Sequence, residues 1–414
     1  MGVQVLNPIP VGEVPAWLTT LSTTFLRDYR GEAAERRAAA RALNWIPERA
    51  WGAREAGRWV ATLATQPRRL TLPGGGELVA DALTNVTVNA THRRRGLLTT
   101  MLGASLDATR ERGEAVSILV AAEWPIYGRF GYAPATQYAD YTFRVGHPRA
   151  LIRPAESGVV RQVEADEFRA AANSVFDGQR LLRAGQVDRD GDWWDRELGT
   201  AGVLRPDDGP LGNLFLHETD GVADGLLAWK PKTDFDLDGT LGSIEVRTLT
   251  AASDVAYRNL WAYLSALDVI DRVDLGLRPV DEPVRWLLPD GRALLQRYAG
   301  DHVWVRLLDV PAALAARGYG SDGRLVLDVV DGDHGGYAAG RYVLEVDAGA
   351  VRCARTTEPA HLRVSQRVLA DVYLGAYSFS QLRTVGVEEL DAGAVQRADA
   401  LFSTPVPPWN ATAF

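Results

Sequence analysis

The chain has 414 residues, of which 46% are apolar and 24% are charged. At roughly 150 residues per domain, this length suggests two or three domains, and the composition excludes a largely disordered or fibrous protein. The net charge of −8 argues against a general nucleic-acid binder and would favour the approach of a cationic substrate.

Two further features limit the class of protein. No segment approaches the roughly 18 consecutive apolar residues of a membrane helix, and the opening residues lack a basic region followed by an apolar run. The one cysteine, Cys353, cannot form an internal disulfide or a thiolate metal site, and its alternating surroundings indicate a structural position in a strand. We therefore expect a cytoplasmic protein without a membrane partner.

The first segment, residues 1–153, reads as a mixed α/β unit. Its expected elements are strands over 58–64, 70–72, 80–88 and 116–121, a turn at 74–76, a helix from 96 to about 113, and a loop and turn over 125–132. The helix is expected because Leu98, Leu102 and Leu106 fall on one helical face. A strand, a basic glycine loop, a helix and a strand, in this order, are typical of a cofactor-binding unit.

The second segment, residues 154–298, repeats the mixed pattern. Helices are expected over 165–176 and 254–267, and strands over 222–230 and 243–249. Its equivalent loop, Leu249-Thr250-Ala251-Ala252-Ser253, has neither the positive charge nor the glycine of the first loop. We interpret this segment as a degenerate copy that supports the first domain.

The third segment, residues 299–414, reads as an α+β module. Strands are expected over 303–308, 324–330, 340–346 and 350–354, followed by helices over 365–374 and 380–385. The last residues are rich in proline but include Trp409 and end on Phe414. A frayed tail would ordinarily be less aromatic, so we expect this ending to have a role.

A strand that includes Val86-Thr87-Val88 leads into the basic loop His92-Arg93-Arg94-Arg95-Gly96, which opens the first long helix. The start of a helix directs unpaired backbone N–H groups at an anion, and Gly96 lets a phosphate approach the backbone closely. A bare arginine triplet is usually a solvated turn, but the flanking strand and helix favour a pyrophosphate site. His92 has no second ligand at metal spacing, and we assign it no catalytic role.

Two acidic segments resemble calcium loops and need separate interpretations. Residues 234–245 match the EF-hand pattern at each position that the pattern specifies, but their flanks read as strands rather than helices. A hairpin turn is therefore the better interpretation, and no metal is predicted. Asp190-Gly191-Asp192 has its glycine in the wrong place for calcium and indicates the start of a helix.

The loop from Arg93 to Leu98, followed by the segment from Glu123 to Tyr132, resembles the enhanced intracellular survival (Eis) family of the GNAT superfamily of N-acetyltransferases. At the position of Leu98, the wider superfamily has Gly or Ala, whereas the Eis branch has Leu. In this respect the sequence resembles the Eis branch. The resemblance implies tandem GNAT folds and a C-terminal α+β domain similar to sterol carrier protein. These would be a catalytic domain over 1–153, a degenerate domain over 154–298 and a carrier-like domain over 299–414.

The resemblance further implies acetyl-coenzyme A as co-substrate, with no metal. The residues that match the family's cofactor contacts are Val86, Thr87, Val88, Arg94, Arg95, Gly96, Leu97, Leu98, Thr99, Ala122 and Glu123.

In the family, the general acid is a tyrosine that matches Tyr127. The general base is the C-terminal carboxylate, here that of Phe414. The third domain would bring this carboxylate to the first domain. A phenol with a pKa near 10 is protonated at neutral pH, and an α-carboxylate with a pKa near 3.5 is ionised. The alternatives are that Tyr127 is a core aromatic, as we interpret Tyr132, and that the terminus is disordered.

The resemblance also implies direct transfer to a primary amine, a roomy acidic pocket for polycationic aminoglycosides, and a homohexamer built as a trimer of dimers. Ala413 stands where family members often have an acidic residue, which leaves the substrate range open. Asp28 is either an acidic group of the amine pocket or a solvated surface residue. Two other functions remain open: a protein-lysine or polyamine acetyltransferase, and a non-catalytic lipid- or ligand-binding protein whose first domain is vestigial.

Overall fold

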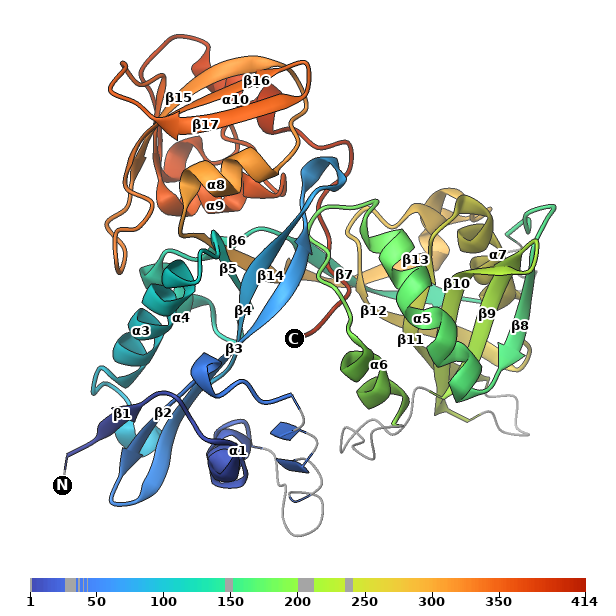
Figure 1. Ribbon diagram of the computed structural model, residues 1–414. Helices are drawn as coiled ribbons and strands as arrows, with labels where there is room; N and C mark the ends of the chain where they lie inside the picture. The colour runs from blue at the N-terminus through green and yellow to red at the C-terminus, as the bar shows by residue number, and fades with distance from the viewer. Residues whose placement is uncertain are drawn as a thin grey trace. The chain divides into compact units, whose positions relative to one another are not determined.

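The computed structural model describes residues 2–26, 35, 38–39, 41–42, 44–145, 152–199, 212–234 and 241–414 (Figure 1). The chain forms two compact units, each with its own buried apolar core. The first unit comprises Met1–Ala135, His302–Pro405 and Ala413–Phe414, and the second comprises Thr136–Asp301 and Val406–Thr412.

The first sheet of unit 1 has the strand order β1-β2-β3-β4-β5-β14-β6. Its strands are β1 (Gln4–Leu6), β2 (Ala50–Glu55), β3 (Arg58–Thr71), β4 (Glu77–Val88), β5 (Val116–Val120), β6 (Ala133–Pro134) and β14 (Val303–Leu307). Strand β14 follows the main segment of the second unit in the sequence, yet it pairs antiparallel with both β5 and β6. Residues 136–301 are therefore inserted between two neighbouring strands of this sheet.

The helical segments that accompany this sheet include the expected long helix. They are α1 (Val14–Thr24), α3 (Leu97–Glu111), α4 (Trp124–Tyr127) and the short turns η1 (Val11–Glu13), η2 (Pro47–Arg49), η3 (Pro73–Gly75), η4 (Ala90–His92) and η5 (Gly128–Phe130). On α3, Leu102 and Leu106 are buried and Leu98 is half-buried, as the periodicity predicts. Burying each leucine completely contributes roughly 1.5–3 kcal/mol, which holds this face of α3 on the sheet.

Unit 1 also contains a carrier-like domain with a second sheet in the order β17-β16-β15-β18-β19. Its elements are α8 (Val310–Ala316), β15 (Gly323–Val330), β16 (Gly340–Asp347), β17 (Ala350–Arg355), β18 (Leu362–Ser365), α9 (Gln366–Tyr373), η8 (Arg383–Val385), β19 (Val387–Glu389) and α10 (Ala394–Phe402). Helix α9 contacts β14 and β6 of the first sheet (Figure 1). The acetyltransferase-like sheet and the carrier-like domain thus share one compact unit.

The sheet of unit 2 has the order β13-β7-β12-β11-β10-β9-β8. Its elements are β7 (Gln137–Arg144), β8 (Val159–Val163), α5 (Ala165–Arg180), α6 (Gly191–Leu198), β9 (Asn213–Thr219), β10 (Val222–Thr233), β11 (Gly242–Ala251), α7 (Asp254–Ala266), β12 (Ile270–Arg278), η6 (Pro283–Trp286), η7 (Gly291–Ala293) and β13 (Leu294–Asp301). Strand β7 lies in the segment that the sequence assigned to the first domain, but here it pairs with β12 and β13.

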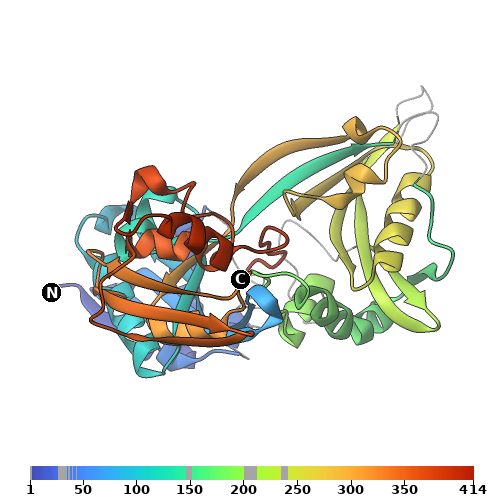
Figure 2. The same ribbon diagram turned by 90° about the horizontal axis from the view of Figure 1, so that it is seen from above.

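Alternating residues of unit 2 strands face two separate cores. Leu226 and Ala228 of β10 pack in the core that includes residues of α5 and α6, whereas Leu227 packs in the core that includes residues of α7. Since successive side chains of a strand point to opposite faces, α5 and α7 cover opposite faces of the sheet, as Figure 2 shows.

Two expected elements differ in the structure. The segment 125–132 begins as the short helix α4, because Pro125 occupies an early helical position that needs no N–H donor. The helix expected over 380–385 is reduced to the single turn η8, which ends before Gly386 at a φ of 143°. The predicted start of a helix at Asp190 is confirmed, since its Oδ1 accepts a hydrogen bond from the Trp193 N–H at 2.8 Å.

Candidate active site

The two central strands of the first sheet separate at one end. Parallel β4 and β5 pair through Asp81, Ala82 and Leu83 of β4, and β4 then continues to Val88. Asn85 has a φ of 56°, and the register between β4 and β3 shifts at this point, which marks a bulge. Beyond Leu83 the backbone of β4, including Val86, has no paired partner on the β5 side of the described sheet. An extended ligand can form hydrogen bonds there as a strand would.

Residues of the predicted cofactor strand differ in burial. Thr87 is buried, and its hydroxyl lies 2.6 Å from that of Thr62, whereas Val86 and Val88 are half-buried. Thr87 is therefore held by the protein itself, and the backbone is the part of this segment that is open to a ligand.

The start of α3 has the geometry of an anion site. Gly96 has a φ of 76° and precedes the helix without a side-chain cap, and the first helical hydrogen bond runs from the Thr100 N–H to the Gly96 carbonyl at 3.0 Å. The N–H groups of residues 97–99 consequently have no intrahelical acceptor. A Cβ at Gly96 would have no atom of the described residues within 4 Å, so these residues leave the approach open. These groups fit a pyrophosphate.

The three arginines of the loop are not equivalent. Arg95 forms an ion pair with Glu55 at 2.9 Å, and the His92 Nε2 lies 2.8 Å from the other oxygen of that carboxylate. The hydrogen bonds from Arg95 and then His92 lower the pKa of Glu55 to about 2. Arg93 and Arg94 are exposed, and neither forms an ion pair within the described part of the chain.

The guanidinium of Arg95 is therefore already paired and that of Arg93 is exposed, although the predicted contacts include Arg95 and omit Arg93. The sequence could not show this difference, because Glu55 lies 40 residues before Arg95. Through this ion pair, Glu55 holds the Arg95 side chain against the hairpin of β2 and β3.

Tyr127 lies at the end of α4 and is 7% exposed. Burial raises the pKa of its phenol to about 12, with a smaller contribution from Glu123. Within the described residues its hydroxyl has no hydrogen-bond partner, so it is available to a ligand. Tyr132, by contrast, is fully buried and its hydroxyl lies 2.7 Å from that of Ser117, which makes it a core residue as expected.

The other predicted residues of the first domain have clear places. Ala122 and Glu123 are exposed between β5 and α4, Leu97 is buried at the start of α3, and Thr99 is exposed there. These segments surround the end of the first sheet where β4 and β5 separate.

The C-terminal residues follow a path that the sequence did not predict. Phe414 is half-buried and belongs to unit 1, as Tyr127 does, but residues 406–412 belong to unit 2. There the Trp409 N–H donates to the Ala184 carbonyl at 2.9 Å, and the Thr412 hydroxyl donates to the Val187 carbonyl at 2.9 Å.

The sequence assigned the whole tail to the third segment, whereas residues 406–412 pack in unit 2 and Ala413–Phe414 belong to unit 1. Two features allow this contact. Gly185, with a φ of 89°, lets the backbone of Trp409 approach, and Arg189 donates to the Ala411 carbonyl at 2.7 Å.

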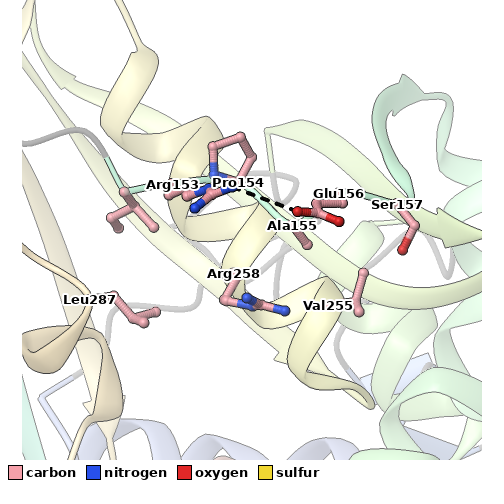
Figure 3. Close-up of a pocket in the computed structure, with 9 residues that line it drawn as sticks. Arg153, Pro154, Ala155, Glu156, Ser157, Val255, Arg258 and Leu287 are labelled. Carbon is pink, nitrogen blue, oxygen red and sulfur yellow. Dashed lines mark ion pairs between the residues drawn. The ribbon is translucent and has the colours of Figure 1, made fainter.

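A depression of about 410 Å³ lies in unit 2. Arg153, Glu156 and Arg258 are among the residues that line it, and Arg153 and Glu156 form an ion pair across 3.6 Å (Figure 3). None of the predicted site residues borders this depression.

Among the described residues there is no group of three or more His, Cys, Asp or Glu side chains that could hold a metal ion. Most of the calcium-like loop, residues 235–240, and Asp28 lie outside the described residues. The flanks of that loop are the antiparallel strands β10 and β11, as predicted, rather than helices. Within the described ranges, no helix is long and apolar enough to cross a membrane.

Family models match three parts of the chain. A GNAT acetyltransferase domain matches residues 7–135, a second GNAT acetyltransferase domain matches residues 185–307, and a sterol carrier protein domain matches residues 310–411. The predicted fold class, two GNAT domains and a carrier-like domain, is thus confirmed.

Known proteins extend the match over nearly the whole chain. An uncharacterized N-acetyltransferase of Streptomyces avermitilis is 39% identical over 412 residues, 98% of this chain and 97% of that protein. N-acetyltransferase Eis of Mycobacterium tuberculosis is 33% identical over 354 residues, 84% of this chain and 83% of that protein. The crystal structure of Eis1 from Mycobacterium abscessus has a TM-score of 0.85 at 30% identity and covers 100% of both chains. The chain therefore belongs to the Eis family of GNAT N-acetyltransferases and is an enzyme of that class.

Proposed function

We propose that the protein transfers the acetyl group of acetyl-coenzyme A directly to a primary amine of a polycationic aminoglycoside. The observation that supports this most is the uncapped start of α3, beside Arg93 and Arg94, which form no ion pair with the described residues. It lies in the same unit as the buried Tyr127, whose hydroxyl has no hydrogen-bond partner among those residues. The net charge of −8 favours a cationic acceptor.

The residues present fit acetyl-coenzyme A, which supplies an activated acetyl thioester when bound. The N–H groups at the start of α3 and the guanidinium groups of Arg93 and Arg94 would hold the pyrophosphate. The open backbone of β4 beyond Leu83 would hold the pantetheine arm by hydrogen bonds. Together they would direct the thioester towards the end of the sheet where β4 and β5 separate.

Tyr127 would act as general acid. Its pKa of about 12 keeps the phenol protonated at neutral pH, so it has a proton to donate to the sulfur of the leaving thiolate. The α-carboxylate of Phe414 would act as general base and accept a proton from the attacking amine. Direct transfer needs no nucleophilic side chain, and burial raises the pKa of Cys353 to about 12, which makes it a poor nucleophile.

The test is release of coenzyme A from acetyl-coenzyme A in the presence of an aminoglycoside. Tyr127→Phe and a chain extended by a few residues beyond Phe414 should both lower kcat, by roughly 100- to 10,000-fold for a general acid. Unfolding of Tyr127→Phe should match that of the wild type, because the hydroxyl has no hydrogen-bond partner in the described chain.

Each assignment has an outcome that contradicts it. Full activity of the extended chain would exclude the terminal carboxylate as base, and full activity of Tyr127→Phe would exclude Tyr127 as acid. Higher kcat/KM for a lysine peptide or a polyamine than for any aminoglycoside would favour those acceptors. A wild type inactive towards every amine would favour the non-catalytic ligand-binding protein.

The family resemblance also supports a cytoplasmic homohexamer, a trimer of dimers, that protects a cell against aminoglycosides. Light scattering of the purified protein would test the assembly, and growth of cells that produce it on an aminoglycoside would test resistance. A monomer in solution would exclude the proposed hexamer.

A further inference from the structure

A fully buried ion pair joins the acetyltransferase sheet to the carrier-like domain. The side chains of Arg306 in β14 and of Asp331, which follows β15, are both 0% exposed, and they form two contacts of 2.7 and 3.3 Å. Asp331 also accepts hydrogen bonds from the N–H groups of Asp333 and Ala338. Because desolvation offsets much of the attraction in such a pair, its presence is better explained by a requirement for one fixed arrangement than by stability alone.

The turn after Tyr127 is built around this guanidinium. A Cβ at Gly131 would lie 1.7 Å from the Arg306 Nη1, and Gly131 has a φ of 78°, so only glycine fits. The Gly131 carbonyl accepts a hydrogen bond from the buried Gln366 of α9 at 3.0 Å. The next residue, Tyr132, donates its N–H to the Tyr127 carbonyl at 3.3 Å, which closes the turn onto Tyr127.

The segment Asp331–Ala338, which we name the carrier loop, contacts both this turn and α3. The His334 N–H donates to the Arg129 carbonyl at 3.3 Å, and the His334 ring lies 5.7 Å from that of Phe130. A Cβ at Gly103 of α3 would lie 2.4 Å from the His334 Nε2.

A second contact of the carrier loop reaches α3 further along. The Tyr337 hydroxyl donates to Asp107 of α3 at 2.9 Å. One loop of the carrier-like domain therefore touches the turn of Tyr127 and the helix whose first N–H groups form the anion site.

We propose that Arg306 and Asp331 are positioning residues which, through the carrier loop, fix the turn of Tyr127 relative to the anion site of α3. The inference rests on the proposed function, in which α3 holds the pyrophosphate and Tyr127 protonates the sulfur of the same ligand. A misplacement of about 1 Å between such groups can reduce a rate roughly 100-fold. The carrier-like domain thus sets catalytic geometry from outside the acetyltransferase sheet.

The main test is the double variant Arg306→Met/Asp331→Leu, which leaves no unpaired buried charge. It should fold and bind acetyl-coenzyme A with a dissociation constant near that of the wild type, but its kcat should fall about 10- to 100-fold. Adding Tyr127→Phe should then lower kcat much less than it does in the wild-type background, because the acid is already misplaced. A merely structural role would leave the two effects multiplicative.

Tyr337→Phe removes only the hydrogen bond from the Tyr337 hydroxyl to Asp107. This variant provides a second test if the double variant does not fold. Its kcat should fall several-fold with an unchanged KM for acetyl-coenzyme A. Tyr319→Phe is the matched control, since that hydroxyl donates to the Leu314 carbonyl within the carrier-like domain, and its kcat should equal that of the wild type.

Two results would overturn the inference: a folded double variant with wild-type kcat, or effects of the double variant and Tyr127→Phe that multiply fully. Wild-type kcat in Tyr337→Phe, where the double variant does not fold, would also overturn it. Failure of the proposed function is distinguishable, because Tyr127→Phe in the otherwise native protein would then be fully active.

Discussion

The starts of α3 and α7 follow the same succession of strand, loop and helix but differ in chemistry. Gly96 precedes α3 without a side-chain cap, and two exposed arginines, Arg93 and Arg94, precede it and form no ion pair with the residues that the structure describes. Ser253 precedes α7, where its Oγ accepts a hydrogen bond from the Ala256 N–H at 3.0 Å and donates one to Asp224 at 2.6 Å. One N–H group in the first turn of α7, that of Ala256, is thus already satisfied by the protein.

Asp224 makes the difference electrostatic as well. Burial acts to raise the pKa of this carboxyl, but hydrogen bonds from Ser253, His217 and Thr219 outweigh burial and keep it below its usual value. An ionised carboxylate therefore lies behind the cap of α7, where it would repel a phosphate. The second domain therefore has the same succession of strand, loop and helix, but the start of its helix lies beside the protein's own carboxylate, that of Asp224.

The largest expected effect is on acetyl-coenzyme A binding, when a carboxylate is placed at the start of α3 as Asp224 is at the start of α7. Gly96→Asp should weaken acetyl-coenzyme A binding by about 100-fold, because a carboxylate would lie at the anion site and a side chain is strained at a φ of 76°. Calorimetric titration measures this. Gly349→Asp is the matched control, since that glycine has a φ of 80° and no atom within 4 Å of a Cβ; equal loss of binding in both variants would refute the electrostatic explanation.

The second prediction compares how much each arginine of the loop contributes to acetyl-coenzyme A binding. Arg93→Ala and Arg94→Ala should each raise the dissociation constant of acetyl-coenzyme A about 10-fold, as expected for loss of a hydrogen bond to a charged group. Arg95→Ala should have a smaller effect, since Glu55 already compensates that charge. The three variants should be compared at several salt concentrations, and an equal effect of all three would contradict the distinction.

The third prediction concerns the cap of α7. Ser253→Ala should lower the free energy of unfolding by about 1 kcal/mol, because the Ala256 N–H loses its acceptor. Urea unfolding measures this change, and kcat should be unaffected. A changed KM for acetyl-coenzyme A would mean that the second domain takes part in cofactor binding.

The smallest effect is on pH dependence. The folded-state pKa of Glu55, about 2, lies below its ordinary value of 4.5. The contribution of its contact with Arg95 is therefore fully present above pH 4.5 and is lost as the pH falls through about 2. The difference in urea midpoint between wild type and Glu55→Gln should therefore narrow as the pH falls below 4.5; a difference that stays unchanged down to pH 2 would contradict this assignment.

Much of the local structure could be predicted because it depends on local pattern. The periodicity of Leu98, Leu102 and Leu106 predicted α3, and the two motifs of the first domain predicted the family. Pairing between distant segments could not be predicted in the same way. The sequence predicted a strand over 303–308, but its pattern does not show which sheet this strand joins, and the strand over 137–144 was not predicted.

The predicted site was incomplete for a related reason. The pairing of Arg95 with Glu55 and the holding of the tail by Arg189 depend on residues far apart in the chain. The ion pair of Arg306 with Asp331 could not be predicted, because neither residue belongs to the two sequence motifs of the first domain. The assigned roles of Tyr127 and Phe414 stay predictions.

The insertion of unit 2 between β6 and β14 determines when the first sheet can be finished during protein synthesis. A ribosome that has made Pro134 must continue to Val303 before the missing strand exists. At about 5–20 residues per second, this takes on the order of ten to thirty seconds. During that time β5 and β6 each present an unpaired edge that other chains can join. All strands of the sheet of unit 2 are made before β14 completes the first sheet, so unit 2 can form while the first sheet still has these open edges.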